Sequence, residues 1–472
     1  MTSCAGWTTA SLSESCLLIT DGTHHSPANG PSGDFRYVTA KNIRRSGLDL
    51  NNITYVDAAT HAEIFRRCPV RNGDLLYIKD GATTGIAIIN PLDEPFSLLS
   101  SVALIRPDPR LLSADFLCHL LNSPELYNQM IGGMTGSAIR RLTLTTISRQ
   151  IIPIPPLPEQ RRIVAKIDSL SAKSKRARDH LDHIPRLVEK YKQAILAAAF
   201  RGELTREWRR FHLPNLPTFD RSRTNQRIAE LGNLPESWCW TEFAEIGAVT
   251  GGLTKNTRRA SLPRRVPYLR VANVYANELR LDDIAEIGCT DAEFEKTRLE
   301  KGDLLIVEGN GSLDQIGRLA LWDGEISGCS HQNHIIRGQA GPNALPAYLL
   351  YWLMSPLGRQ AIEAVASSSS GLHTLSISKV RSLPIPICSV DEQRAVTQRI
   401  ETAFAWIGRL SGEAGSARKL INHFDQAILA KAFRGELVPQ DLRDEPAGVL
   451  LERIRAARPA ASLAQRRAAI RG

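Results

Sequence analysis

Two long stretches of the chain place apolar residues alternately four and three positions apart. The first runs from Ile163 to Ile195 and the second from Val396 to Ile428. Such heptad patterns predict helices that pack lengthwise, most simply against each other as an antiparallel spacer; the alternative is that each helix binds another subunit. The predicted contact positions are Ile163, Ile167, Leu170, Leu181, Ile184, Val188, Ile195, Val396, Ile400, Ile407, Leu410, Ile421, Phe424 and Ile428.

The two predicted helices should differ in the middle, but both should end at the same motif. Pro185 lies inside the first pattern and should kink or split it, because proline cannot donate the helical hydrogen bond. The matching position in the second pattern holds Arg418, which should leave that helix unbroken. Each pattern ends in the letters RGEL, where Gly202 or Gly435 predicts the stop.

Long parts of the chain are repeated. The letters AILAAAFRGEL at 194–204 return as AILAKAFRGEL at 427–437. Further back, YVTAKNI at 37–43 corresponds to YLRVANV at 268–274, and GDLL occurs in both halves. The spacing of 229 to 233 residues throughout indicates two diverged copies of one unit, each a globular part followed by a helical part.

The globular parts alternate short apolar runs at strand spacing with helical stretches. The predicted fold is therefore α+β, with two mixed α/β domains in tandem pseudo-repeat, separated by two long antiparallel coiled-coil helices. We predict a first domain at 1–156, a central helical spacer at 157–235, a second domain at 236–387, a C-terminal helical spacer at 388–440 and a basic tail at 441–472. The tail should contain a short helix through Leu450, Leu451 and Ile454.

Charge is distributed unevenly along the chain. The net charge of +10 suggests a polyanionic partner. Counting Lys and Arg against Asp and Glu gives 13 − 13 = 0 for the first domain and 15 − 17 = −2 for the second. The central and C-terminal helical parts carry 17 − 9 = +8 and, for 388–472, 14 − 10 = +4. The excess positive charge thus lies outside the two globular domains.

The sequence contains no recognisable catalytic motif. Phosphate-binding loops, a nucleophile elbow, an HExxH pair and an amino-methyltransferase motif are all absent. Cys329, His331 and His334 lie close together in the sequence, but no neighbouring pair supplies the remaining zinc ligands, so we predict no metal. The eight dispersed cysteines, the lack of a targeting signal and the lack of a long apolar run lead us to expect a cytoplasmic, reduced protein.

Several of the repeated motifs resemble one family. DGTH and VTAKNI in the first half, LRVANV, KGDLLIVEGNGS, LALWDGEISGC and HQNHIIR in the second, and the PIPxLPEQRRIV-type and AILxxAFRGEL-type helices are similar to the specificity subunit of type I restriction-modification systems. The resemblance covers essentially the whole chain. It implies two target recognition domains that each read half of a bipartite, asymmetric DNA site, with helices that set the spacing.

The resemblance also implies partners. The expected partners are double-stranded DNA, two methyltransferase subunits and restriction subunits, with no membrane. A specificity subunit is not catalytic and takes part in host defence through the assembled enzyme. No cofactor is expected in this chain, whereas S-adenosylmethionine, ATP and Mg²⁺ are expected in the partner subunits.

Candidate DNA contacts are the polar side chains that crowd in loops of the two domains. Phosphates are bound mainly by Lys and Arg, and base edges also by Asn, Gln and His. The candidates are His24, Lys41, Asn42, Arg44, Arg45, Lys79, Arg140, Arg141, Lys255, Arg258, Arg259, Arg270, Asn273, His331, Asn333 and His334.

Two alternative functions remain open at this stage. The first is an orphan DNA-binding or coiled-coil scaffold that has the same sequence features but no active modification partner. The second is an enzyme with its own nuclease or methyltransferase, which the absent motifs disfavour. Neither the DNA sequence nor the spacer length follows from the amino-acid sequence.

Overall fold

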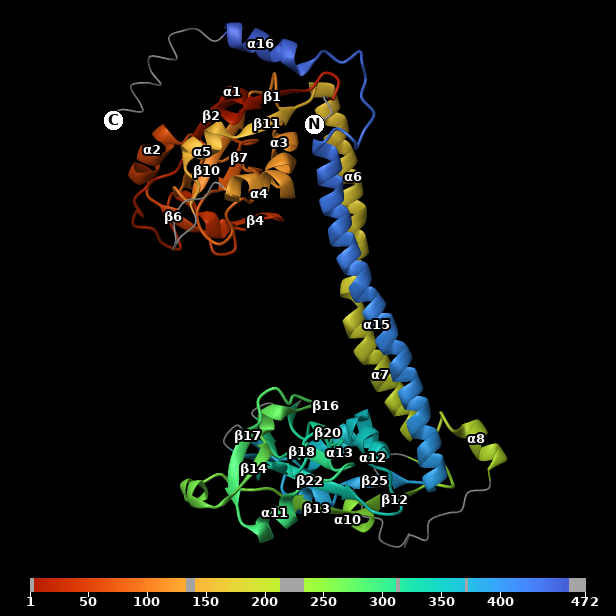
Figure 1. Ribbon diagram of the computed structural model, residues 1–472. Coiled ribbons are helices and arrows are strands. Elements are labelled where there is room, and N and C mark those ends of the chain that lie inside the picture. The colour runs from red at the N-terminus through yellow and green to blue at the C-terminus, as the bar shows by residue number, and fades with distance from the viewer. Residues whose placement is uncertain (1–3, 133–140, 213–232, 311–314, 370–371, 458–472) are drawn as a thin grey trace. The chain divides into compact units, whose positions relative to one another are not determined.

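The computed structural model describes residues 4–132, 141–212, 233–310, 315–369 and 372–457 (Figure 1). The chain divides into two compact units. Unit 1 consists of Met1–Asp182 together with Gly415–Gly472, and unit 2 consists of His183–Ala414. Each unit thus combines one globular domain with parts of the long helices.

A four-stranded antiparallel sheet forms the centre of unit 1. In spatial order its strands are β2 (Cys16–Asp21), β10 (Val102–Pro107), β7 (Leu75–Ile78) and β8 (Ala87–Ile89). Alternate residues of β7 enter two different hydrophobic cores, as the two-residue period of a strand requires. The other elements of this domain are β1 (Thr8–Ser11), α1 (Leu12–Ser15), β3 (Phe35–Val38), the 3₁₀ turn η1 (Ala40–Asn42), β4 (Ile43–Arg44), β5 (Gly47–Leu48), β6 (Thr54–Val56), α2 (Ala58–Arg67), β9 (Ser97–Leu98), α3 (Ala114–Leu121), α4 (Pro124–Gly132), α5 (Leu144–Arg149) and β11 (Ile151–Ile154).

Unit 2 contains a second four-stranded antiparallel sheet. Its order is β13 (Gly247–Gly251), β22 (Ile335–Ala340), β18 (Leu304–Val307) and β20 (Leu319–Leu321). The other elements are α8 (Arg206–Phe211), β12 (Cys239–Glu242), α10 (Phe243–Ile246), η3 (Thr257–Ser261), β14 (Arg264–Leu269), η4 (Val271–Asn273), β15 (Val274–Tyr275), β16 (Glu278–Leu279), β17 (Ala285–Cys289), α11 (Asp291–Thr297), β19 (Gly309–Asn310), β21 (Ser330–His331), α12 (Pro346–Met354), α13 (Pro356–Val365), β23 (Ser367–Ser369), β24 (Leu372–Thr374), α14 (Ile377–Arg381) and β25 (Pro384–Ile387).

The two domains share one topology. The sheet β2-β10-β7-β8 corresponds to β13-β22-β18-β20. Each domain also has a smaller three-stranded sheet, β6-β3-β9 in unit 1 and β17-β14-β21 in unit 2. Its central strand pairs antiparallel with one neighbour and parallel with the other. The register of the parallel pair agrees as well: Val38 lies opposite Leu98 in unit 1, and at the equivalent position of unit 2 Leu269 lies opposite His331. The predicted pseudo-repeat of two mixed α/β domains is confirmed.

The long helices differ where the sequence predicted. The first is split into α6 (Leu157–Asp182) and α7 (Ile184–Phe200), with Pro185 at the start of α7, while α15 (Val390–Phe433) is continuous over 44 residues. Gly202 and Gly435 both have left-handed backbones, with φ of 73° and 74°, and follow the helix ends as expected.

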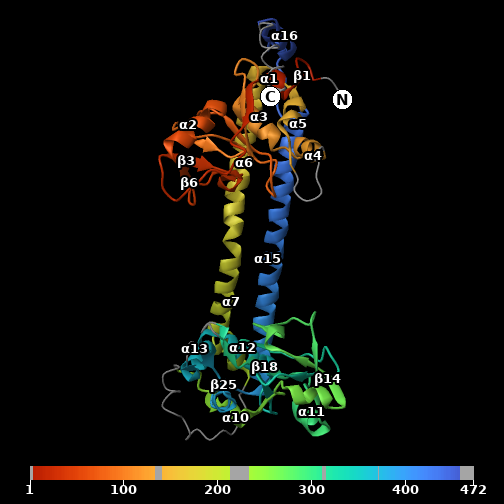
Figure 2. The same ribbon diagram turned by 90° about the vertical axis from the view of Figure 1, so that its left-hand side faces the viewer.

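The helices run antiparallel within each unit. In unit 1, Arg178 of α6 binds Asp425 of α15 at 2.6 Å, and Asp182 binds Arg418 at 2.6 Å. In unit 2, the Lys192 ammonium of α7 lies 5.5 Å from the centre of the Phe404 ring of α15. Figure 2 shows α6 and α7 each next to its part of α15. The predicted antiparallel pairing is therefore confirmed within each unit.

Most of the predicted contact positions are buried or partly buried, several of them in the cores of the globular domains. Ile163, Ile167, Val396, Ile400, Ile407 and Ile428 are buried, and Leu170, Leu181, Ile184, Val188, Ile195 and Ile421 are partly buried. The prediction is wrong for Leu410 and Phe424, which are 42% and 49% exposed. A pair of helices covers only the strip that faces the partner, so residues at the edge of a wider apolar face stay in solvent.

The repeated letters at the helix ends anchor each long helix in the globular domain of the other repeat copy. Phe433 packs edge-on against Phe116 of α3, with ring centres 5.4 Å apart. In unit 2, Phe200 packs edge-on against Tyr348 and Trp352 of α12 at 5.2 and 5.3 Å. The repeat therefore provides one aromatic anchor for each domain.

The GDLL motif places a buried carboxylate in each domain. Asp74 is 3% exposed, and both of its oxygens accept hydrogen bonds of 2.7 Å from the guanidinium of Arg106. The equivalent Asp303 lies 3.7 Å from Arg337, and burial raises its pKa. These pairs join neighbouring strands of the central sheets, so their role is structural.

The predicted helix of the tail is also present. It is α16 (Ala447–Ala457), with Leu451 and Ile454 buried and Leu450 partly buried. The helix packs against the N-terminal segment of unit 1 through an ion pair of 2.6 Å between Arg455 and Glu14. The remainder of the predicted tail, 458–472, lies outside the described residues.

Candidate nucleic-acid interface

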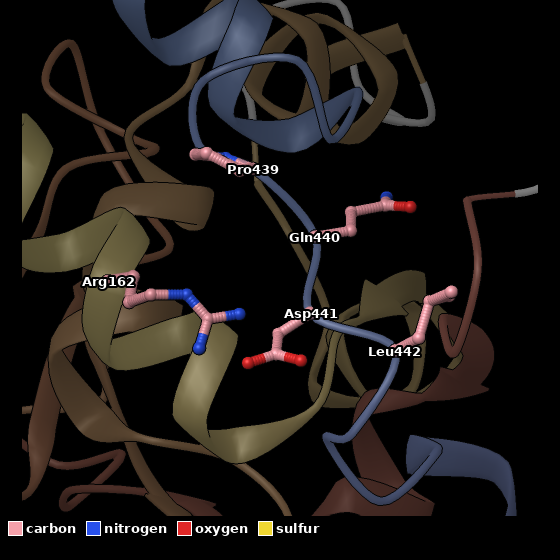
Figure 3. A pocket seen from close by; sticks show the side chains of 5 residues that line it. All are labelled: Arg162, Pro439, Gln440, Asp441 and Leu442. Carbon is pink, nitrogen blue, oxygen red and sulfur yellow. The ribbon is translucent and has the colours of Figure 1, made fainter.

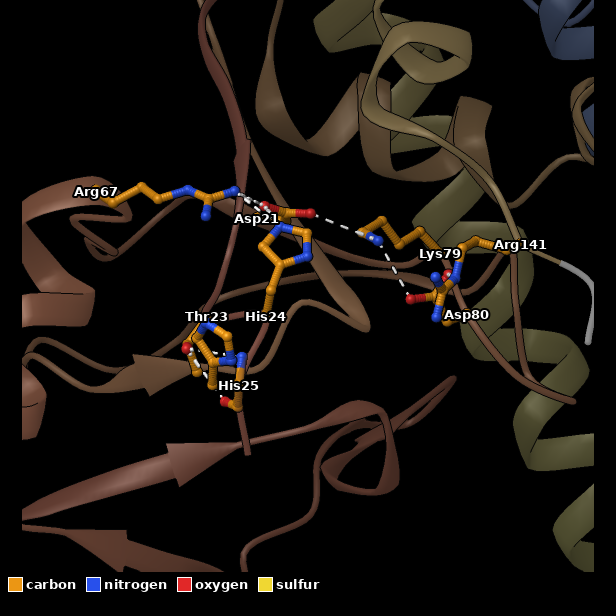
Figure 4. Close-up of polar contacts among 8 residues, drawn as sticks. All are labelled: Asp21, Thr23, His24, His25, Arg67, Lys79, Asp80 and Arg141. Atoms are coloured by element: carbon orange, nitrogen blue, oxygen red, sulfur yellow. Dashed lines mark hydrogen bonds and ion pairs between the residues drawn. The ribbon is translucent and has the colours of Figure 1, made fainter. Parts of the chain in front are cut away.

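A cluster of charged side chains in unit 1 surrounds the carboxylate of Asp21, at the end of β2 (Figure 4). Arg67, at the end of α2, binds one oxygen of Asp21 at 2.5 Å, and Lys79, directly after β7, lies 3.5 Å from the other. His24 contacts the same carboxylate at 3.2 Å. The cluster is completed by two further contacts of 3.2 Å, from Asp80 to Lys79 and to Arg141.

The cluster has an inner and an outer layer. The side chains of Asp21, Lys79 and Asp80 are at most 12% exposed, whereas those of His24, Arg67 and Arg141 are more than half exposed. The buried carboxylates therefore hold two guanidiniums at the surface, where such groups bind phosphate oxygens.

A short hairpin formed by β4 and β5 carries further cationic side chains of unit 1. The turn before it is held by Asn42, whose side-chain oxygen accepts a hydrogen bond from the Thr39 N–H at 3.0 Å and whose amide donates to the Asp49 carbonyl at 3.3 Å. Lys41, Arg44 and Arg45 are exposed around this anchor. The turn held by Asn42 therefore fixes the backbone positions of these three cationic residues.

The equivalent hairpin of unit 2, β15 and β16, is anchored in the same way. The side-chain oxygen of Asn273 accepts from the Arg270 N–H at 2.8 Å, and its amide donates to the Arg280 carbonyl at 2.8 Å. Next to this anchor, the guanidiniums of Arg280 and Arg318 lie 3.8 and 5.1 Å from the centre of the Tyr275 ring. Arg270 itself binds Asp283 at 2.7 Å.

Comparisons with known proteins agree with this architecture. A family model described as the type I restriction modification DNA specificity domain matches residues 6–183. The EcoKI specificity subunit of Escherichia coli K12 is 27% identical and the StySPI specificity subunit of Salmonella potsdam 26% identical, each over 96% of both chains. Over nearly its whole length, this chain is similar to the specificity subunits of type I restriction-modification systems. Each of these two relatives is named as the specificity subunit of a type I restriction enzyme.

Solved structures share the fold of this chain. A chain from a study of complex assembly and conformational transition of the type I system superposes with a TM-score of 0.65 at 19% identity, over 92% of this chain and 99% of that one. The HsdS subunit from Thermoanaerobacter tengcongensis gives a TM-score of 0.57 at 19% identity, over 92% and 98%.

Four of the residues predicted to contact DNA are buried. Asn42 and Asn273 hold turns, and Lys79 lies between two carboxylates. His331 is fully buried, and its Nδ1 faces the Thr297 carbonyl at 3.1 Å. We correct these four assignments, because each side chain serves the interior of its domain.

The remaining predicted residues fall into three groups. Arg259 binds Glu293 at 2.9 Å and the Gly288 carbonyl at 3.1 Å, so its role is structural, and Arg270 is half-buried beside Asp283. His334 is exposed and binds Glu308 at 2.8 Å, while the neighbouring Asn333 is partly buried. The side chains that stay at the surface are His24, Lys41, Arg44, Arg45, Arg141, Lys255 and Arg258, whereas Arg140 lies outside the described residues.

Sequence reasoning missed Arg67, Arg280 and Arg318. They are isolated in the sequence from the basic groups that drew notice, and only the folded chain brings them next to Asp21 or Tyr275. Only Arg280 could have been found from the sequence. It lies shortly after the YLRVANV motif and occupies the position that Asp49 has in the first copy of the repeat.

A surface cavity of about 470 Å³ lies elsewhere in unit 1 (Figure 3). Arg162 of α6 and the loop from Pro439 to Leu442 line it. Arg162 is already bound to Asp444 at 2.6 Å, and the Arg443 guanidinium lowers the pKa of Asp441 to about 2. The charged groups here are paired with each other, which indicates a structural joint.

The described part of the chain also bears on metal binding and membrane crossing. Within it, no group of three or more His, Cys, Asp or Glu side chains is placed to hold a metal ion. No helix there is long and apolar enough to cross a membrane.

The buried His331 makes the stability of unit 2 sensitive to acid. Burial lowers its pKa from the ordinary 6.5 to about 4. Between pH 6.5 and pH 4 this histidine is protonated in the unfolded chain but not in the folded chain. The free energy of unfolding that unit 2 has above pH 6.5 should therefore fall by about 3 kcal/mol as the pH approaches 4. We expect His331→Leu to remove most of this loss in urea unfolding at pH 7 and pH 4.5.

Leucine suits this position because the equivalent residue of unit 1 is the buried Leu98. The matched control is His25→Leu, which changes an exposed histidine of unit 1. An equal pH dependence of the original chain and the His331→Leu chain would contradict the assignment.

Proposed function

We propose that this specificity subunit reads a bipartite, asymmetric DNA sequence, one half with each unit, and docks two methyltransferase subunits and the restriction subunits. The observation that carries the proposal is the pair of domains with one topology and different exposed side chains. Two readers of the same design but different surface chemistry suit a site whose halves differ in sequence. S-adenosylmethionine, ATP and Mg²⁺ then belong to the partner subunits.

The helices support the docking part of the proposal. Several apolar side chains on α7 and α15 are between 42% and 69% exposed: Leu187, Tyr191, Trp406 and Leu410 in unit 2, and Leu420 and Phe424 in unit 1. A helix pair with apolar residues left outside its shared strip is suited to receive further helices, as in a bundle. We assign these exposed apolar side chains, in each unit separately, to contacts with the methyltransferase subunits.

Methylation mapping tests the recognition part. We expect a host that expresses this chain with its neighbouring methyltransferase subunit to carry methyl-adenine at one gapped, asymmetric motif. A strain that lacks only this chain should lose it. If both strains show the same methylation while the methyltransferase is expressed and active, the proposal fails and an orphan scaffold is favoured.

A further inference from the structure

The hairpins β4–β5 and β15–β16 have the same framework in both units. Each has a two-residue loop, with Ile43 opposite Leu48 in one and Val274 opposite Leu279 in the other. The first residue of each hairpin, Ile43 or Val274, is fully buried. An asparagine fixes the turn before each one, as described above. The base of each hairpin is thus pinned to its domain core.

The side chains on and directly beside these hairpins differ between the units. At equivalent positions, unit 1 has Lys41, Arg44, Arg45 and Asp49, and unit 2 has Ala272, Tyr275, Ala276 and Arg280. In unit 1 the Arg44 guanidinium lies 3.9 Å from Asp49, whereas in unit 2 the Arg280 guanidinium stacks on Tyr275. An identical support therefore presents different chemistry in the two units.

We propose that these two hairpins determine which bases the units recognise, through Arg44 and Arg45 in unit 1 and through Tyr275 and Arg280 in unit 2. The inference rests on the proposed function and extends it to particular residues. The major groove of DNA admits a two-stranded β-ribbon, and arginine reads guanine with two hydrogen bonds.

The contacts of Arg280 favour base reading over a loose phosphate contact. Its side chain is 54% exposed, so donors reach the surface, yet Tyr275 lies under its guanidinium at 3.8 Å and Glu278 binds its Nε at 3.1 Å. A guanidinium that is already held by two neighbouring side chains loses less conformational freedom on binding a base edge than an unrestrained guanidinium does. Arg318, directly before the edge strand β20, lies against the same ring and supports this arrangement.

The experiment uses the whole complex in the host described above, with methyl-adenine mapped by long-read sequencing. One variant carries Tyr275→Ala with Arg280→Ala, and another carries Arg44→Ala with Arg45→Ala. Each should relax or change one half of the gapped motif and lower methylation of the original sites about tenfold or more. The unaltered half reports that the chain is folded and the complex assembled.

Matched controls separate the hairpins from general charge effects. Arg265→Ala removes a guanidinium that is 52% exposed and paired with Glu286 at 3.3 Å, much like Arg280 with Glu278. Arg66→Ala removes an exposed cation of α2 in unit 1. Both controls should leave the motif unchanged. Arg280→Lys keeps the charge without the fork and should still relax the sequence preference.

Three outcomes are distinguishable. A change confined to the expected half-site supports the inference. Unchanged half-sites in both hairpin variants, or a uniform fall in methylation at all sites, would overturn it while the proposed function stands. Absence of any gapped motif with the unaltered chain would overturn the proposed function and this inference with it.

Discussion

Replacing Trp406 and Leu410 by aspartate should prevent methyltransferase subunits from copurifying with this chain and should lower adenine methylation by about a thousandfold or more. Both side chains belong to the exposed apolar face of α15 in unit 2, at 57% and 42% exposure. In the free chain the new carboxylates would remain in water, so the helix should form normally. In a helix bundle they would be buried without partners, and each would cost several kcal/mol.

The control for this prediction is Leu442→Asp, which introduces the same charge at a leucine that is 87% exposed in a loop of unit 1. This variant should retain its methyltransferase subunits. Circular dichroism of both purified chains should match that of the original chain. Full recovery of the methyltransferase with the Trp406→Asp and Leu410→Asp chain would rule out this face as the docking surface.

The second large effect concerns stability. Arg106→Ala should destabilise unit 1 by about 3 to 5 kcal/mol, because it leaves the Asp74 carboxylate buried without its charged partner. Both Asp74 oxygens bind this guanidinium at 2.7 Å, and the carboxylate cannot reach solvent without disturbing the central sheet. Hydrogen exchange followed by mass spectrometry should show faster exchange in β7 and β10.

The same experiment contains its own reference in unit 2, whose β18 and β22 should keep their protection. Arg201→Ala serves as a control, since it breaks an exposed ion pair of 2.7 Å with Glu203 and should change little. Equal protection of β7 in the Arg106→Ala chain and the original chain would show that the buried pair contributes no net stability.

The sequence predicted the helices and the repeat well because heptad spacing is a local signal and the repeat can be read directly from matching letters. Heptad spacing survives folding unchanged, and the effect of Pro185 on the first helix follows from its missing N–H. Leu410 and Phe424 were assigned to the contact strip because periodicity marks an apolar face without saying how much of it a single partner covers.

The candidate interface was harder to predict because side-chain direction depends on the tertiary fold. Asn42 and His331 are polar residues in motifs rich in polar letters, yet one holds a turn and the other lies in a core. Conversely, Arg67 and Arg318 have no sequence neighbours that mark them, and their positions follow from contacts with Asp21 and Tyr275. Burial and pairing distinguish such residues, and neither is a property of the sequence alone.

The division of the chain into units has a consequence for its synthesis. Unit 2 is one contiguous segment, whereas the core of unit 1 combines side chains from both ends of the chain, including Phe116 with Phe433, Leu451 and Ile454. Chains are made from the N-terminus and domains generally fold as units. The first domain to leave the ribosome is therefore the last to complete its core. A messenger RNA truncated near its end would release a protein with a complete unit 2 and an incomplete unit 1.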